Sequence, residues 1–487
     1  MASTARPRKQ QRPGARAAAG APGELVVLTV PPGPTITARA LRESRSVRGR
    51  IDEILPGTAR LEPIFGPDNR LADRLAHTPQ APAAGEYLRY FTVRGAVGDL
   101  GELADRLRAD DTVAAAYVKP PAEPPLAPLA EAAVVTQEAP PVTPDFRSRQ
   151  AYLDAAPTGV DAHWAHTRPG GLGTGVRVID VEGAWRFTHE DLRQNQGGVI
   201  GGNASDELGW RNHGTAVAGE ISGDLNAFGI TGIAPEAHIR AVSIFGIGSA
   251  TAIRSAADAL DPGDVLLIEL HRPGPRFGYR TTADQRGYIA VEWWPDDFAA
   301  VRYAVGRGIV VVEAAGNGGE NFDDPIYDAR PAEFPADWRN PFRGGPVDSG
   351  AVVVGAGAPP PGLHGRDHGP ARSRLAFSNY GARLDVQGWG REVTTTGYGD
   401  LQGGPDEDLW YTDEFSGTSS ASPIVVGAVA AYQGIRARTG GRATPEQIRA
   451  LLRATGSPQT EAPARPVTQR IGALPDVRAM VERGGGS

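Results

Sequence analysis

The C-terminal two-thirds of the chain alternates continuously apolar runs with helical patterns. Residues 265–270 and 309–312 are almost entirely apolar, which is typical of strands buried on both faces of a parallel sheet. Residues 299–305 and 445–452 have the apolar spacing of helices. This alternation predicts an α/β fold over residues 151–487, with a doubly wound, mostly parallel sheet.

The N-terminal third has shorter signals. Leu100, Leu103, Ala104 and Leu107 follow helical spacing, whereas residues 87–93 alternate as a strand does. The pattern predicts a small α+β domain of the ferredoxin-like kind over residues 23–119. Its expected strands cover residues 24–30, 60–65, 87–93 and 113–118, and its expected helices cover residues 37–47, 69–76 and 100–107.

Two segments outside these domains have biased composition. Residues 1–22 carry five basic side chains and no acid, and predict a disordered basic arm, either a solvated tail or a segment for an anionic partner. Residues 120–150 are rich in proline and alanine, and predict an extended, semi-rigid linker.

A candidate nucleophile lies in residues 415–423. A Gly-Thr turn there presents Ser419 at the start of a buried helix. Free backbone N–H groups and the positive end of the helix dipole lie beside such a serine. These groups stabilise the charge that develops in acyl transfer, although a serine at this position can also simply cap its helix.

A candidate base and acid lie upstream. His213 precedes a Gly-Thr step, and Asp180 ends an apolar strand, so its carboxylate can accept the ring N–H of a histidine. His189 follows Asp180 too closely and is interpreted as structural. Glu182 is either a second carboxylate that tunes the site or a loop residue. Asn317 follows the run at 309–312 and can donate to an oxyanion or form a turn.

The order Asp180, His213, Asn317, Ser419 resembles that of the subtilisin-like serine peptidases. Residues 228–235, 349–356 and 377–381 also resemble motifs of that family, and the resemblance covers about residues 150–480. Two positions depart from the family pattern. Asp180 is followed by Val-Glu-Gly rather than Thr-Gly or Ser-Gly, and Ser420 stands where methionine is common. The chain therefore resembles a divergent branch.

The resemblance implies a serine endopeptidase that acts on peptides or proteins. Ser419 would attack, His213 would take the proton, Asp180 would orient His213, and Asn317 with the Ser419 N–H would hold the oxyanion. Residues 23–119 would be a prodomain, an intramolecular chaperone and inhibitor, with self-processing inside the linker. A permanently attached structural domain is the alternative. An acyl-transferring peptide-maturation enzyme and a binding module whose cleft is plugged also remain open.

The resemblance also implies a pocket for the side chain before the scissile bond. Its expected lining consists of Glu269, Ala314, Ala315 and Gly316. If Glu269 faces into this pocket, basic side chains would be favoured. No cofactor is expected to be required. The acidic loop at residues 323–328 has the clustered oxygens that calcium binds, with a solvated loop as the alternative.

The amino-acid composition restricts the possible partners, chemistry and location of the protein. The net charge of −7 gives no indication of a nucleic-acid or membrane partner. The absence of cysteine excludes a thiol nucleophile and disulfides. No secretory signal or membrane-spanning run is visible, so a cytoplasmic location is expected. Lys9 and Lys119 are the only lysines, and the bias toward arginine, alanine and glycine is typical of a GC-rich bacterial genome.

Overall fold

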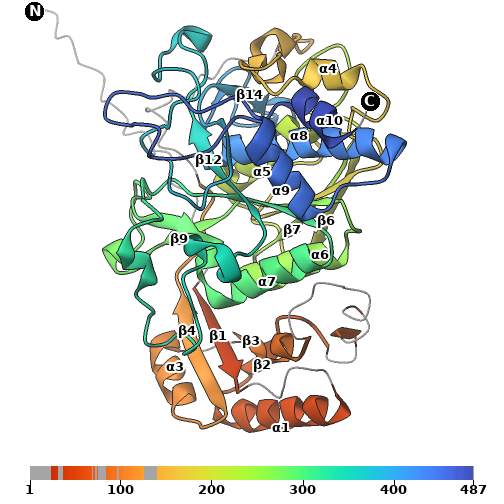
Figure 1. The fold of residues 1–487 in the computed structure, drawn as a ribbon. Coiled ribbons are helices and arrows are strands. Elements are labelled where there is room, and N and C mark those ends of the chain that lie inside the picture. The colour runs from red at the N-terminus through yellow and green to blue at the C-terminus, as the bar shows by residue number, and fades with distance from the viewer. Residues whose placement is uncertain are drawn as a thin grey trace, which may run out of the picture.

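The computed structural model has a small N-terminal domain below a larger domain (Figure 1). It describes residues 23–30, 37–67, 70, 71, 74, 84–95, 98–125 and 140–485. The predicted basic arm at residues 1–22 and residues 126–139 of the predicted linker lie outside the described residues.

The N-terminal domain has the β–α–β–β–α–β order of ferredoxin-like folds. Its four strands form an antiparallel sheet in the order β2-β3-β1-β4. The elements are β1 (Glu24–Thr29), α1 (Ala38–Ile54), β2 (Arg60–Pro63), β3 (Tyr90–Arg94), α3 (Leu100–Arg108) and β4 (Val113–Lys119).

One predicted strand begins later than expected. Residues 84–89 form a 3₁₀ helix, and only Tyr90–Arg94 pairs as β3. The Tyr87 ring, 4.6 Å from Phe65 and 5.5 Å from Tyr303 between centroids, packs at the contact with the larger domain. Tertiary packing of this aromatic residue therefore overrides the local alternation. The expected helix at residues 69–76 lies largely outside the described residues.

The larger domain is built on a seven-stranded sheet in the order β13-β12-β11-β8-β5-β7-β6. Every neighbouring pair in it is parallel, as the continuous apolar runs predict. Its strands are β5 (Arg177–Glu182), β6 (Gln196–Gly201), β7 (His238–Ser243), β8 (Val265–Ile268), β11 (Val310–Ala314), β12 (Val352–Gly357) and β13 (Val386–Trp389).

Helices cover both faces of this sheet, which confirms the predicted doubly wound α/β fold (Figure 1). The two faces belong to separate hydrophobic clusters, one around α6 and α7 and the other around α5 and α8 to α10. The helices are α4 (Ala162–His166), α5 (Leu208–Ser222), α6 (Ser249–Asp258), α7 (Pro295–Gly306), α8 (Thr418–Thr439), α9 (Pro445–Thr455) and α10 (Val477–Gly484). Short antiparallel pairs join β9 (His271–Pro273) to β10 (Tyr288–Ala290) and β14 (Val393–Thr396) to β15 (Tyr411–Phe415).

The alternation along β5 directs two acids to one side. Ile179 and Val181 belong to the cluster on the α6 and α7 face, whereas Val178 belongs to the cluster on the α5 and α8 face. Because successive strand side chains point to opposite faces, Asp180 and Glu182 share the α5 and α8 face. This face carries the helices with His213 and Ser419.

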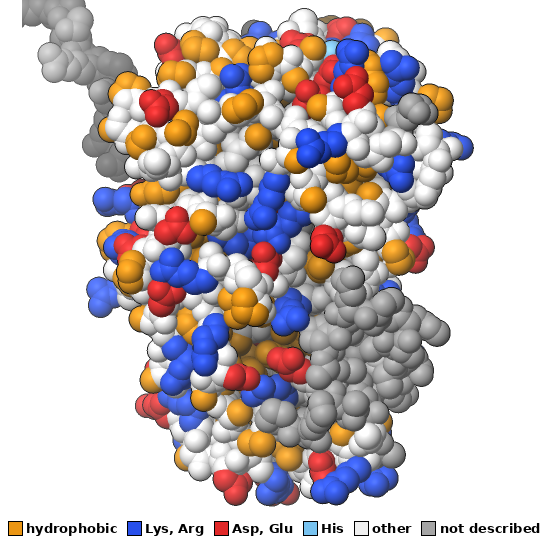
Figure 2. All heavy atoms as spheres, viewed as in Figure 1, with side chains coloured by type: hydrophobic (Ala, Val, Ile, Leu, Met, Phe, Trp, Pro, Cys, Tyr) orange, Lys and Arg blue, Asp and Glu red, His pale blue; other side chains and the backbone are white. Residues whose placement is uncertain are grey.

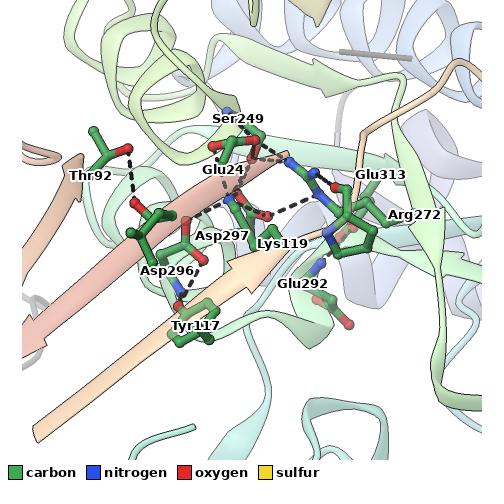
Figure 3. Close-up of polar contacts among 12 residues, drawn as sticks. Glu24, Thr92, Tyr117, Lys119, Ser249, Arg272, Glu292, Asp296, Asp297 and Glu313 are labelled. Atoms are coloured by element: carbon green, nitrogen blue, oxygen red, sulfur yellow. Dashed lines mark hydrogen bonds and ion pairs between the residues drawn. The ribbon is translucent and has the colours of Figure 1, made fainter. Parts of the chain in front are cut away.

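The two domains meet across a buried polar cluster (Figure 3). Lys119 Nζ lies 2.6 Å from Asp296 Oδ2 and 3.1 Å from both oxygens of Asp297. Arg272 Nη2 lies 2.5 Å from Glu24 Oε1. Side chains of Lys119, Arg272, Asp296 and Asp297 are fully buried. One hydrophobic cluster also continues across the boundary, so the N-terminal domain is packed as part of the molecule.

The surface carries charges of both signs. On the face in Figure 2, basic and acidic side chains are interspersed over both domains. Within the described part of the chain, no helix has the length and apolar character needed to cross a membrane.

Candidate active site

Ser419 lies in the first turn of α8 and is completely buried. Gly417, which precedes the helix, has φ of 114°, a conformation that favours glycine. A Cβ at this position would overlap the carbonyl oxygen of Pro125 and lie 3.1 Å from both Ser419 Oγ and Asn317 Nδ2. The glycine therefore leaves room for a carbonyl oxygen beside the serine and the amide.

His213 lies on α5, but its partner is not the predicted one. Its Nδ1 lies 2.8 Å from Glu182 Oε2, and both side chains are fully buried. Nε2 has no hydrogen-bond partner among the described residues. With Nδ1 protonated, the ring donates to Glu182 and keeps a free lone pair on Nε2. Burial lowers the pKa of His213 to about 3, so the ring is neutral at pH 7.

Asp180 was expected to accept this N–H, but it lies two residues before Glu182 on β5 and has another partner. Its Oδ2 accepts a hydrogen bond of 2.7 Å from Trp185 Nε1. Burial and the neighbouring Glu182 raise the pKa of Asp180 well above its usual range. Burial also raises the pKa of Glu182, while hydrogen bonds from Asp180 and Gly183 oppose that rise. Burial therefore disfavours a negative charge on both acids, and the interaction between the two side chains makes the charge on Glu182 the less disfavoured one.

Strand geometry explains why Glu182, not Asp180, meets the histidine. Both acids lie on the same face, but β5 continues to Glu182 at the carboxyl edge of the sheet. Gly183 follows directly, and a Cβ there would overlap the Trp210 ring. The unusual Val-Glu-Gly sequence after Asp180 was the available signal. His189, in contrast, is bound to the Trp410 carbonyl at 2.8 Å, which is a structural contact.

The turn before Ser419 fixes the orientation of the Asn317 side-chain amide. Its Oδ1 accepts hydrogen bonds from Thr418 N at 2.9 Å and Thr418 Oγ1 at 3.0 Å. Nδ2 has no partner among the described residues, and like the Pro125 carbonyl oxygen it borders the space where a Cβ of Gly417 would lie. An amide donor held in this way can stabilise a developing oxyanion.

The cleft is occupied by the chain's own residues 122–125, which are all buried. Ser419 Oγ donates a hydrogen bond of 2.6 Å to the Pro125 carbonyl oxygen. Two residues earlier, Glu123 exchanges two backbone hydrogen bonds of 3.1 Å with His271 of β9. This antiparallel bridge is the kind of pairing with which an extended peptide adds to an exposed strand. We call residues 122–125 the cleft segment.

The residues expected to form the side-chain pocket are arranged differently. Glu269 is fully buried, and its Oε1 accepts from Ser422 on α8. Ala314 ends β11, and the Ala315 carbonyl accepts from Asn379 Nδ2 at 2.7 Å. A Cβ on Gly316 would lie 2.9 Å from Asn379 Nδ2 and 3.3 Å from His271 Cβ. Asn379 and His271 therefore fill the space above Gly316.

Sequence reasoning missed three residues that contact the cleft segment. Tyr288 Oη lies 3.0 Å from Glu123 Oε1, and Gln285 Nε2 donates to the Pro124 carbonyl at 3.0 Å. The His271 ring lies 4.7 Å from the Tyr288 ring between centroids. These residues lie on the β9–β10 hairpin and the loop within it, and no motif in the sequence marks them.

The acidic loop considered for calcium is held by protein groups. Asp324 pairs with Arg276 at 2.6 Å, and Asp328 pairs with Arg343 at 2.6 Å. A second acidic group, Asp400, Asp413 and Glu414, brings three carboxylates together among the described residues. Ion pairs already join Asp413 to Arg149 and Glu414 to Arg366.

The larger domain is similar in sequence to known proteins. Residues 158–472 match the model of the subtilase family, Peptidase_S8. Subtilisin BL of Lederbergia lenta is 30% identical over 277 residues, which cover 56% of this chain and 80% of that protein. Subtilisin E of Bacillus subtilis (strain 168) is 26% identical over 286 residues, 57% of this chain and 61% of that protein.

A solved structure extends the likeness in fold. Fervidolysin from Fervidobacterium pennivorans, a keratinolytic enzyme related to subtilisin, superposes with a TM-score of 0.56 at 18% identity. The match covers 96% of this chain and 62% of the fervidolysin chain, so this chain spans less than two-thirds of that protein. The family model, the subtilisin relatives and the shared fold lead to one conclusion: the chain belongs to the subtilase family and is a subtilisin-like serine endopeptidase.

Proposed function

We propose that this endopeptidase cleaves its own chain between Pro125 and Leu126 and that Glu182, not Asp180, is the acid of its triad. The observation that carries the proposal is the 2.6 Å hydrogen bond from Ser419 Oγ to the Pro125 carbonyl oxygen. The antiparallel bridge at Glu123 aligns the segment as a substrate would lie. The bond after Pro125 falls within the linker in which self-processing is expected.

In the first step, Ser419 Oγ attacks the Pro125 carbonyl carbon while His213 Nε2 takes the hydroxyl proton. Asn317 Nδ2 and the Ser419 N–H stabilise the oxyanion. His213 then gives its proton to the Leu126 nitrogen, the C–N bond breaks, and Pro125 remains as an ester on Ser419. Water, deprotonated by His213, hydrolyses this ester and regenerates the serine.

Asp180 acts on this reaction as a positioning residue. Trp185 Nε1 fixes one of its oxygens, and burial together with the neighbouring Glu182 raises its pKa, which favours the protonated form. A protonated Asp180 donates to Glu182, which keeps the negative charge that stabilises the imidazolium of His213. Under this proposal one proton shared by two acids replaces the single aspartate expected from the family pattern.

The N-terminal domain would act as an inhibitor and folding chaperone in the same chain. It packs through a shared hydrophobic cluster and the buried contacts of Lys119. Lys119 precedes the cleft segment by only two residues, Pro120 and Pro121. Docking of the domain therefore holds the segment in the cleft, and the segment covers Ser419 until it leaves.

The proposal is tested by intact-mass spectrometry of the full chain, with and without an alkyl fluorophosphonate. We expect one adduct on the wild type, none on Ser419→Ala, and a new N-terminus at Leu126 in the wild type alone. Added amine separates hydrolysis from acyl transfer, because a transferase would join the amine to Pro125. A chain that stays intact and takes up no adduct would contradict the proposal and favour the plugged binding module.

A further inference from the structure

We infer that this enzyme selects substrates with proline before the scissile bond and glutamate two residues earlier, and that Tyr288, Gln285 and His271 read these positions. The inference rests on the proposed function, because it takes the cleft segment as a model of a bound substrate. It names a substrate class, Glu-Pro-Pro sequences, for cleavage in other proteins as well as in the chain's own linker.

The glutamate is held by side chains as well as by backbone. Tyr288 Oη donates to Glu123 Oε1 at 3.0 Å, and Gln285 Nε2 approaches Glu123 Oε2 at 3.3 Å. Tyr288 is fully buried, and Glu123 and Gln285 are nearly so. Two donors aimed at two carboxylate oxygens favour an acid over an amide, because an amide would direct its own N–H groups toward one of them.

Gln285 has a backbone conformation typical of a functional position. Its φ is +55°, in the left-handed region that residues other than glycine, asparagine and aspartate seldom adopt. The same side chain donates to the Pro124 carbonyl at 3.0 Å. Gln285 thus contacts two successive residues of the cleft segment from this uncommon backbone conformation.

The position before the scissile bond suits a compact side chain. His271 and Asn379 occupy the space above Gly316, where the predicted pocket would receive a long side chain. Asn379 is locked by hydrogen bonds to the carbonyls of Tyr288 and Ala315, at 2.8 and 2.7 Å. A large aromatic or basic side chain could enter only by displacing these buried groups.

The two prolines of the cleft segment also limit the number of backbone hydrogen bonds that it can form with the enzyme. Pro124 and Pro125 have no N–H, so the two backbone hydrogen bonds of the bridge fall on Glu123 alone. A segment of consecutive prolines is already extended in solution and loses little entropy when it binds. Recognition therefore depends more on side-chain contacts than backbone pairing alone would require.

Peptidyl phosphonates that react with an activated serine test this inference on the full-length protein. Ala-Glu-Pro-Pro, Ala-Gln-Pro-Pro and Ala-Glu-Pro-Phe phosphonates are compared by their labelling rates on Ser419, each divided by the rate of an alkyl fluorophosphonate. We expect the Glu-Pro-Pro probe to react about tenfold faster than each of the others. Equal rates would overturn the inference and leave the proposed function intact. No labelling by the alkyl probe would overturn both.

Three variants and one control test which residues discriminate between the probes. Tyr288→Phe and Gln285→Ala should each reduce the Glu-over-Gln ratio several-fold, whereas Tyr303→Phe, which removes a tyrosine hydroxyl bound to Asp258, should leave it unchanged. His271→Gly should open the space above Gly316 and raise the Phe-to-Pro ratio. A change in this ratio cannot result from misfolding, which lowers all rates together. Unchanged ratios in all three variants would contradict the assignment.

Discussion

Two clusters of ionisable side chains are buried in this protein, and they differ in the cations beside their acids. The cluster at the domain contact contains Lys119 and Arg272, which outweigh the effect of burial on Glu24 and lower its pKa to about 2. At Asp297 of the same cluster, burial and the neighbouring Asp296 raise the pKa to about 7. Beneath the active site, Asp180, Glu182, Glu220 and Glu269 lie without a lysine or arginine among the groups that shift their pKa, and burial raises the pKa of all four.

The difference lies in what compensates the buried acids. At the domain contact, two cations pair with the acids and hold two surfaces in one geometry, although Asp297 can still take up a proton near pH 7. Buried carboxyls without a cation must take up protons, and a shared proton can move when a neighbouring ring changes charge. We therefore expect the ion pairs of Lys119 and Arg272 at the domain contact to be structural, and we call them the clamp. We expect Asp180 and Glu182, beside His213, to take part in the reaction, and we call them the reactive unit.

The largest expected effect follows from removing the charge of the reactive unit. Glu182→Gln keeps the shape of the side chain but cannot stabilise the imidazolium of His213. We expect self-cleavage and fluorophosphonate labelling to slow by about 10⁴-fold, the effect of an acid-to-amide change in other serine triads. Rates from intact-mass time courses check this. A loss of less than tenfold would show that Glu182 is not the triad acid.

The next effect concerns the clamp. Lys119→Met, made with Ser419→Ala to keep the chain uncut, leaves Asp296 and Asp297 without their closest cation. Breaking a fully buried pair from one side costs about 3–5 kcal/mol of unfolding free energy. Urea unfolding measures this. Arg39→Met, which removes an exposed ion pair with Glu43, is the control and should change little.

The third prediction concerns pH. With the cleft segment in place, the pKa of His213 is about 3, so the neutral base persists from pH 8 down to pH 5.5. Self-cleavage should therefore change little over that range and be lost only as the pH falls through the low pKa. A histidine of ordinary pKa would lose about 90% of its neutral form by pH 5.5. A tenfold decline in the cleavage rate between pH 8 and 5.5 would contradict this prediction.

The smallest effect is expected at the second acid of the reactive unit. Asp180→Asn replaces a protonated carboxyl by an amide that still donates to Glu182 and accepts from Trp185. We expect the self-cleavage rate to fall by less than tenfold, far less than in Glu182→Gln. Asp180→Leu, which removes the donor, should slow the reaction further at an unchanged fold. If the asparagine variant were as slow as Glu182→Gln, the negative charge would reside on Asp180.

The sequence predicted the parallel sheet because apolar runs are local signals, and local glycine turns marked His213, Asn317 and Ser419 as candidate catalytic groups. The acid was harder to assign, because Asp180 and Glu182 are two residues apart on β5 and therefore point to the same face of the sheet. Only the position at which the strand ends determines which of them contacts His213 on α5. Gln285 and Tyr288 could not be found in this way. They contact Glu123, which is 162 and 165 residues away in the sequence, through tertiary contacts.

The scarcity of lysine has a practical consequence. Only Lys9 and Lys119 occur in the sequence, and Lys119 is inaccessible while the N-terminal domain is docked. An amine-reactive reagent can therefore modify this position only after the domain has moved away. The clamp that holds the domain carries its own chemical reporter, so peptide mapping of Lys119 would measure the opening of the molecule in a crude extract, without any engineered label.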